Sequence, residues 1–160
     1  NKRIALAPER MLADVPRLEA LLSRPASGAD ELLLIGRRDL RSNNSWMANS
    51  ERLARGTRRC ALLMHPDDAE PRGLVDGAMV RVESRVGTID VALDITDAMM
   101  PGVVCLPHGW GHDREGVRLR TARAHGGASH NDLTDDQRVD ALSGNAAFCG
   151  TAVRVRAVAG

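Results

Sequence analysis

Two glycine-bearing polar segments hold most of the side chains in this chain that could bind a ligand, and each contains one of its two tryptophans. The first spans residues 34–50 and the second spans residues 100–112. Each begins as a short apolar run, which is typical of a buried strand, and continues as a loop dense in Arg, Asn, Ser, His and Gly. Folding alone gives no reason to place so many hydrogen-bonding groups at strand ends. We therefore expect both loops to bind a large polar cofactor with phosphates and heteroaromatic rings.

Arginine side chains follow the first of these strands. Arg37, Arg38 and Arg41 come directly after it, and four more arginines lie within residues 52–59. A guanidinium can hold phosphate oxygens with a planar fork of donors. The alternative is a solvated face, because all of the 22 basic residues except Lys2 are arginine. Phosphate contact is the interpretation that we carry forward for Arg37 and Arg38.

Four consecutive hydroxyl and amide side chains at residues 42–45 precede a predicted helix over residues 46–54, which we expect to end at Gly56. One such residue is enough to cap a helix. Four of them, with Asn49 one turn further on, exceed that need, and a helix N-terminus lined by hydroxyls and amides suits an anion. We expect this stretch to contact the ligand through Ser42, Asn43, Asn44, Ser45, Trp46 and Asn49.

The second loop carries two histidines, His108 and His112, on either side of Gly109, Trp110 and Gly111. Histidines four residues apart can share a metal on a helix. Two glycines and a preceding proline make a helix unfavourable here, so we do not expect a metal site. Glycine allows the backbone to approach a ligand closely, and the indole ring could pack against a heteroaromatic ring.

A third polar cluster, residues 129–134, contains Asn131 between His130 and Asp132. Amide and carboxylate side chains can read the donor and acceptor edge of a pterin or a guanine. They are equally ordinary turn residues, and both interpretations stay open on the residues alone.

Six short apolar or alternating runs predict strands at 31–35, 61–64, 79–84, 88–93, 103–106 and 151–158. A short helix is expected from Asp14 through Leu22, and another over 66–72 that ends at Gly73. Residues 107–144 show little periodicity. Six short strands with few helices favour a closed barrel over a layered parallel sheet. We expect residues 1–30 to be an extension and linker, and residues 31–160 to form one domain.

The composition narrows the possible functions. A formal net charge of +1 disfavours a nucleic-acid partner, and the lack of an internal lysine excludes a lysine Schiff base or a P-loop.

The spacing of Cys60, Cys105 and Cys149 matches neither a zinc site nor a redox pair, so we expect all three to be buried thiols. No secretory leader or membrane-length run is visible, which favours the cytoplasm, and the first residue, Asn1, indicates a fragment.

At these residues the chain resembles the C-terminal molybdopterin-dinucleotide-binding domain of the dimethyl sulfoxide reductase family of molybdenum or tungsten oxidoreductases, which includes formate dehydrogenases and nitrate reductases. The resemblance runs from about residue 31 to residue 158. The pieces that carry it are residues 36–49, 64–69, 76–77, 101–112 and 131–134, followed by Asp140 and Ser143-Gly144. Their order and spacing are more specific than any one of them.

The resemblance implies a mainly β, six-stranded double-psi β-barrel of the aspartate-decarboxylase-like type with short peripheral helices. It also implies bis-(molybdopterin guanine dinucleotide) as the ligand. Loop 37–49 would contact the dinucleotide and loop 108–112 the pterin, while Asn131 and Asp140 would hold ring edges. The metal ligand, the substrate site and any iron–sulfur cluster would belong to upstream domains of the same polypeptide. This chain would then be one cofactor-binding part of an enzyme and would hold no catalytic residue.

Two alternatives use the same barrel. A stand-alone aspartate-decarboxylase-like enzyme cleaves itself at a Gly-Ser dipeptide, and this chain contains none. The other is a barrel that binds only proteins and no cofactor. The two polar loops argue against that interpretation, and ligand binding would decide.

Overall fold

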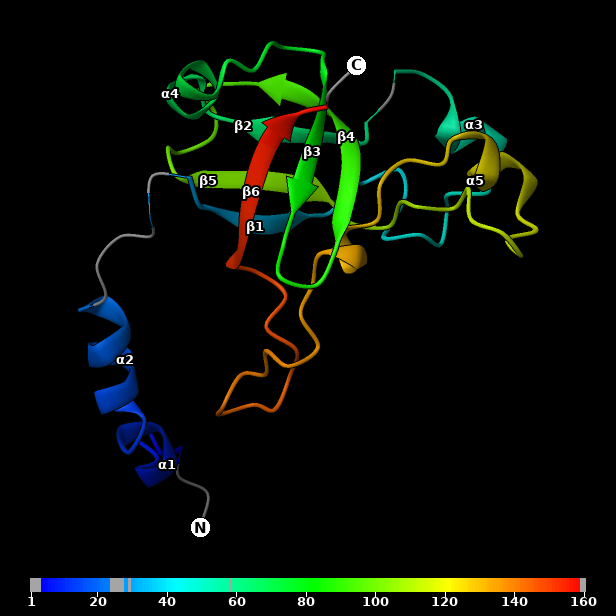
Figure 1. Ribbon diagram of the computed structural model, residues 1–160. Coiled ribbons are helices and arrows are strands. Elements are labelled where there is room, and N and C mark those ends of the chain that lie inside the picture. Colours follow the sequence, from blue (N-terminus) through cyan, green and yellow to red (C-terminus); the bar gives the residue numbers. More distant parts are fainter. Residues whose placement is uncertain (1–3, 24–27, 29, 58, 159–160) are drawn as a thin grey trace.

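The structure is a computed structural model that describes residues 4–23, 28, 30–57 and 59–158, in which six strands close into one barrel (Figure 1). The strands are β1 (Leu32–Arg37), β2 (Ala61–Met64), β3 (Met79–Glu83), β4 (Thr88–Ile95), β5 (Val103–Pro107) and β6 (Thr151–Ala157). All six lie where the sequence predicts them, with ends that differ by at most two residues. The predicted closed barrel is confirmed.

The strands follow the order β1-β5-β2-β4-β3-β6 around the barrel, and β6 closes it against β1. The pairs β1·β5 and β2·β4 are parallel, and the other four are antiparallel. The pairing is symmetric: if β1, β2 and β3 exchange places with β4, β5 and β6, every pair becomes an existing pair of the same direction. For example, β1·β5 becomes β4·β2 and β1·β6 becomes β4·β3. The barrel is therefore two interleaved three-strand halves, the double-psi arrangement, although no repeat is visible in the sequence.

The core fills the inside of the barrel with aliphatic side chains. Val80 and Val82 of β3 are fully buried and pair with Val91 and Ile89 of β4. Alternation of inward apolar and outward polar residues sets this register, because a slip by one residue would turn every side chain to the other face. Burial of each such side chain stabilises the fold by about 1.5–3 kcal/mol.

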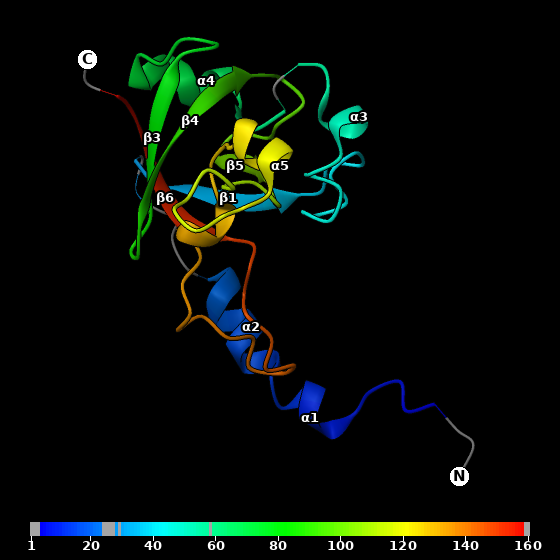
Figure 2. The same cartoon turned by 90° about the vertical axis from the view of Figure 1, so that its right-hand side faces the viewer.

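Short helices surround the barrel. The predicted helix after Asp14 is α2 (Val15–Leu22), which lies away from the barrel in Figures 1 and 2, with α1 (Glu9–Leu12) farther out. The helix predicted after β2 is α4 (Pro66–Ala69), extended by the 3-10 turn η1 (Glu70–Arg72) to Gly73. Within the described part of the chain, every helix is too short or too polar to cross a membrane. The division of the chain at residue 30 stays a prediction.

One helix prediction was wrong, and two short helical elements were not predicted. The helix expected over residues 46–54 is only α3 (Glu51–Ala54), because Asn43 and Asn44 adopt left-handed φ angles of 44° and 61° and the chain runs in turns as far as Asn49. The segment that lacked periodicity contains α5 (Arg120–Ala124) and the 3-10 turn η2 (His130–Asp132). The side chain that caps the first turn of α5 is Asn49, about 70 residues earlier in the chain, so the local sequence does not predict this helix.

The expectation of three buried thiols was also wrong in part. Cys105 on β5 is buried, Cys60 is half-buried and Cys149 is exposed, and all three are free. Cys149 lies in the irregular segment before β6, where the neighbouring Phe148 turns toward the barrel and leaves the thiol outside.

Candidate functional site

The two polar loops leave the barrel at the same end. β1 and β5 run parallel with Arg37 opposite Pro107, so the chain that follows each strand emerges at the same edge. The backbone N–H of His108 donates to the Arg37 carbonyl oxygen at 2.9 Å, which continues the pairing into the loops. Figure 1 shows these loops gathered with α3 and α5 beside the barrel. The sequence-predicted residues on the two loops therefore belong to one surface.

The loops touch through their backbones at Gly109. This residue has a φ of +95°, and a Cβ built on it would overlap the carbonyl oxygen of Asn44. Asn44 and Asn43 are themselves left-handed, a conformation that asparagine tolerates better than other non-glycine residues. The close approach requires a glycine here, and it fixes the position of the second loop on the first.

Asp39 organises the first loop, and sequence reasoning missed it. Its Oδ1 accepts from the backbone N–H of Arg41 at 2.8 Å, and its Oδ2 lies 2.9 Å from Nε of Arg59 at the approach to β2. Ser42 is buried, and its hydroxyl donates to the Asp39 carbonyl oxygen at 3.3 Å. The Ser42 hydroxyl therefore shapes the loop, and Ser42 also lines the cleft between the loops.

Asn49 also has a structural partner. Its Oδ1 accepts from the backbone N–H groups of Thr121 at 3.0 Å and Ala122 at 3.3 Å. These are unpaired donors of the first turn of α5, so Asn49 caps a helix that belongs to the second polar segment. This contact fastens α5 against the first loop.

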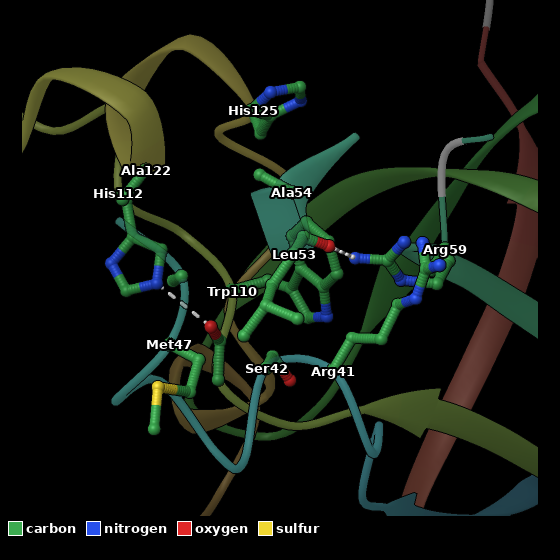
Figure 3. Close-up of a pocket in the computed structure, with 12 residues that line it drawn as sticks. Arg41, Ser42, Met47, Leu53, Ala54, Arg59, Trp110, His112, Ala122 and His125 are labelled. Carbon is green, nitrogen blue, oxygen red and sulfur yellow. Dashed lines mark hydrogen bonds between the residues drawn. The ribbon is translucent and has the colours of Figure 1, made fainter. Parts of the chain in front are cut away.

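A cleft lies between the two loops, and Figure 3 shows Trp110 beside Leu53, Arg41 and Arg59 within it. His112 turns back on its own loop, where its Nε2 lies 2.8 Å from the Gly109 carbonyl oxygen. On the other side of Trp110 a wider cavity of about 590 Å³ continues to the outer faces of β3 and β4. The cleft therefore opens into a space of the size that small-molecule sites occupy.

The thiol of Cys60 forms part of the wall of this cavity. Its Sγ accepts from the backbone N–H of Ala128 at 3.3 Å, and Gly127 passes directly against it and against Trp110. Burial is the main cause that raises the pKa of Cys60. A thiol with a raised pKa is a poor nucleophile at neutral pH, so Cys60 acts as packing.

An aromatic cluster closes the barrel beneath the loops. The ring of His130 on η2 stacks on Phe148 with 4.1 Å between centroids and 21° between planes. His108 meets Phe148 edge-on at 5.2 Å, and the guanidinium carbon of Arg38 lies 5.4 Å from the centre of the same ring. Burial lowers the pKa of His130 to about 4, and burial also lowers the pKa of His108. Sequence reasoning missed His130 and Phe148, although Phe148 is the only phenylalanine in the chain.

A family model for the molybdopterin dinucleotide binding domain matches residues 32–152. The chain belongs to this family. It is 31% identical over 129 residues to a Halobacterium salinarum protein named as a dimethyl sulfoxide reductase catalytic subunit, a match that covers 74% of this chain and 15% of that protein. It is 46% identical over 55 residues to the dimethyl sulfoxide/trimethylamine N-oxide reductase of Rhodobacter capsulatus, over 34% of this chain and 7% of that protein.

Among solved structures, the acetylene hydratase of Pelobacter acetylenicus superposes with a TM-score of 0.66 at 21% sequence identity. The match covers 91% of this chain and 20% of that protein, and it supports the double-psi barrel. The molybdopterin dinucleotide binding domain described here thus spans between 7% and 20% of these three relatives. The family resemblance predicted from the sequence is confirmed, as is its place within molybdoenzymes related to dimethyl sulfoxide reductase.

The polar groups of the site fit a cofactor of this kind. Buried side-chain atoms that lack a hydrogen-bond partner gather at this end of the barrel, on Arg37 (Nε), Asn44 (Oδ1), His108 (Nδ1), Trp110 (Nε1) and His130 (both ring nitrogens). Two other described residues carry such an atom, Thr151 and Arg59, and Nε of Arg59 lies 2.9 Å from the Asp39 carboxylate. Each such group costs about 1–3 kcal/mol, and a ligand with ring edges and phosphates can satisfy the donors and acceptors on Arg37, Asn44, His108 and Trp110.

The remaining predicted residues divide into two groups. Asn43, Ser45 and Trp46 are exposed on the rim of the first loop, with Trp46 83% exposed, and Asn131 is exposed directly after His130. Asp140 is not brought to the site. It lies in the loop before β6, where its Oδ1 accepts from the backbone N–H of Ser143 at 2.7 Å. In the described residues no three His, Cys, Asp or Glu side chains gather as metal ligands.

Proposed function

We propose that this domain binds bis-(molybdopterin guanine dinucleotide) at the loop-covered end of its barrel, as one part of a larger molybdenum or tungsten oxidoreductase. The observation that carries the proposal is the concentration of buried, unpaired donors and acceptors on Arg37, Asn44, His108 and Trp110. A domain that binds only proteins would gain nothing from placing these groups in a closed cleft, because each one opposes folding until a ligand pairs with it.

Within this site the residues have different tasks. Arg37 and Arg38 would hold phosphate oxygens, with the amides and hydroxyl of the rim beside them. The loop from His108 to His112 would lie against a pterin, with Trp110 offering a ring face. Gly109 holds this loop against Asn44, and Gly111 packs against Ser129. Asn131 would meet a ring edge. Ser42 and Asn49 support the loops through the contacts described above, and Asp140 bonds within its own loop before β6.

The bound metal would supply the redox chemistry, and this domain would bind and orient its organic part and exclude water from it. We propose that other domains of the same polypeptide supply the metal ligand, the substrate pocket and any iron–sulfur cluster, because the chain spans so small a share of its relatives. Those relatives are named for different substrates, among them sulfoxides and acetylene. The formate dehydrogenase-like activity and the cytoplasmic location stay predictions.

Retention of the cofactor tests this proposal. The purified chain is dialysed to equilibrium against molybdopterin guanine dinucleotide, and the cofactor that the chain retains is measured as the guanosine monophosphate released by hydrolysis. We expect Arg38→Met to retain less than the wild type, since a charge-assisted hydrogen bond contributes about 1.5–3 kcal/mol. Arg156→Met is the matched control, because Arg156 lies on β6, paired with β3. Equal retention by both variants, or none by the wild type, would contradict the proposal.

A further inference from the structure

His130 is the most deeply buried ionisable side chain of the site, and the proposed function leaves it without a task. Only 1% of the residue is exposed, and no hydrogen bond of normal geometry reaches either ring nitrogen. An unpaired imidazole in a closed core is unfavourable. His130 lies in the turn η2, at the junction of the ligand-binding segments.

Through Phe148, His130 is connected to three other segments. The Phe148 ring lies directly over the backbone of Gly36 in β1, where an added Cβ would overlap it. Its other contacts are the stacked ring of His130, the edge of His108 and the guanidinium of Arg38. A shift of the His130 ring would therefore move the partner that both His108 and Arg38 rest against.

The surroundings of His130 favour its uncharged form. The groups with charge that face it are Arg38, which follows β1, and His108, which follows β5, while the segment before β6 contributes the apolar ring of Phe148. On its own turn, Asp132 is paired with Arg114. Burial lowers the pKa of His130 most, His108 and Arg38 lower it further, and the carbonyls of His130 and Ile35 oppose this only in part.

We propose that His130 is a positioning residue of the cofactor site, whose uncharged ring, stacked on Phe148, holds the His108 imidazole and the Arg38 guanidinium where the cofactor contacts them. The inference rests on the proposed function for the identity of the ligand. It adds that the arrangement of the site depends on a residue that does not touch the ligand, and that acid disorders the site by placing a positive charge beside Arg38.

The test uses the whole chain with three variants. His130→Phe keeps a flat ring that can stack and removes the charge, whereas His130→Ala removes the stack. His65→Phe is the matched control, because His65 caps α4 and lines neither the cleft nor the wider cavity. Nuclear magnetic resonance of the imidazole rings gives the position and titration of His108, whose shifts depend on its edge contact with Phe148. The binding probes are 6-hydroxymethylpterin and guanosine diphosphate, each titrated at pH 7 and at pH 4.

We expect the wild type to bind both probes at pH 7 and more weakly at pH 4. His130→Phe should keep the pH 7 affinity and the His108 shifts and bind equally well at pH 4. His130→Ala should lose the His108 shifts and bind about tenfold more weakly, which corresponds to about 1.4 kcal/mol. His65→Phe should resemble the wild type in probe binding and in the His108 shifts.

Unchanged His108 ring shifts in His130→Ala would overturn the inference, as would loss of pH 7 binding in His130→Phe to the level of His130→Ala. An acid loss of binding in His130→Phe as large as in the wild type would also overturn it. If the wild type binds neither probe, the proposed function fails. The ring shifts of His108, which need no ligand, then still decide whether His130 positions that side chain.

Discussion

The contact between Gly109 and Asn44 yields a prediction that isolates the packing of the two loops. Gly109→Ala places a methyl group where the Asn44 carbonyl oxygen lies, with the backbone nitrogen of Ser45 at 3.0 Å. The obstacle is backbone on both sides, so no side-chain rotation can relieve it. The second loop must move away from the first, by about 1 Å or more, and displacements of that size in binding sites can cost 10²-fold in activity.

The magnitude divides into two parts. A left-handed φ at alanine costs about 1 kcal/mol, and overpacking costs typically about 1–3 kcal/mol more. Gly109→Ala should therefore lower the free energy of unfolding by about 2–4 kcal/mol, the sum of those two ranges. Gly116→Ala is the matched control, because Gly116 has a φ of +84° and no atom lies within 4 Å of its added Cβ. It should show the backbone part alone.

Urea unfolding followed by tryptophan fluorescence measures both variants, since Trp110 lies next to the substituted glycine and Trp46 lies on the opposing loop. The probe titrations described above are then repeated on each folded variant. Gly109→Ala should lose stability and probe affinity, and Gly116→Ala only a little stability. Equal losses in the two variants would refute the idea that backbone contact joins the loops.

Three further predictions follow from the same contacts. Asn49→Ala should lower the free energy of unfolding by about 1 kcal/mol because α5 loses its cap, with the exposed Asn131→Ala as control in the same urea experiment. The stability of the wild type should not change with pH above about 6.5, and its free energy of unfolding should fall by up to about 3 kcal/mol as the pH falls from there toward 4. The reason is that the His130 imidazole takes up a proton in the unfolded chain over this range, whereas burial keeps it uncharged in the folded chain. His130→Phe should lose this pH-dependent component, and an unchanged acid slope would contradict the assignment. Elemental analysis of the purified chain should find molybdenum and tungsten well below one atom per chain, because the domain offers only part of the surface that encloses the cofactor. Assays should find no dye-linked formate or nitrate turnover. Stoichiometric metal, or turnover, would prove the partial-site view wrong.

The strands could be predicted from the sequence because their signals are local. β3 and β4 alternate inward valine, isoleucine and leucine with outward polar residues around a tight turn, and the pattern needs no partner to be read. The polar loops after β1 and β5 could be predicted for the same reason, since each follows its strand directly. Their meeting could be expected because both follow strand ends and share the same ligand-like composition, and the parallel pairing of β1 with β5 explains it physically.

The parts that could not be predicted depend on distant contacts. α5 begins where Asn49 caps it, and His130 and Phe148 meet across the end of the barrel, so neither event leaves a periodic pattern. The same holds for Asp39, whose partner Arg59 lies at the next strand. Ser42 and Asn49 were assigned to the ligand by composition alone, and composition does not reveal that each also supports the loops through a hydrogen bond.

Binding of the cofactor between the two loops, at one end of the barrel, can be tested directly by nuclear magnetic resonance. Backbone amide shifts of the labelled chain are recorded while molybdopterin guanine dinucleotide is added, so that every described segment reports separately. We predict the largest changes at residues 37–49 and 108–112, with the hairpin of β3 and β4 nearly unchanged. Changes centred on that hairpin, or none at saturating cofactor, would contradict the account.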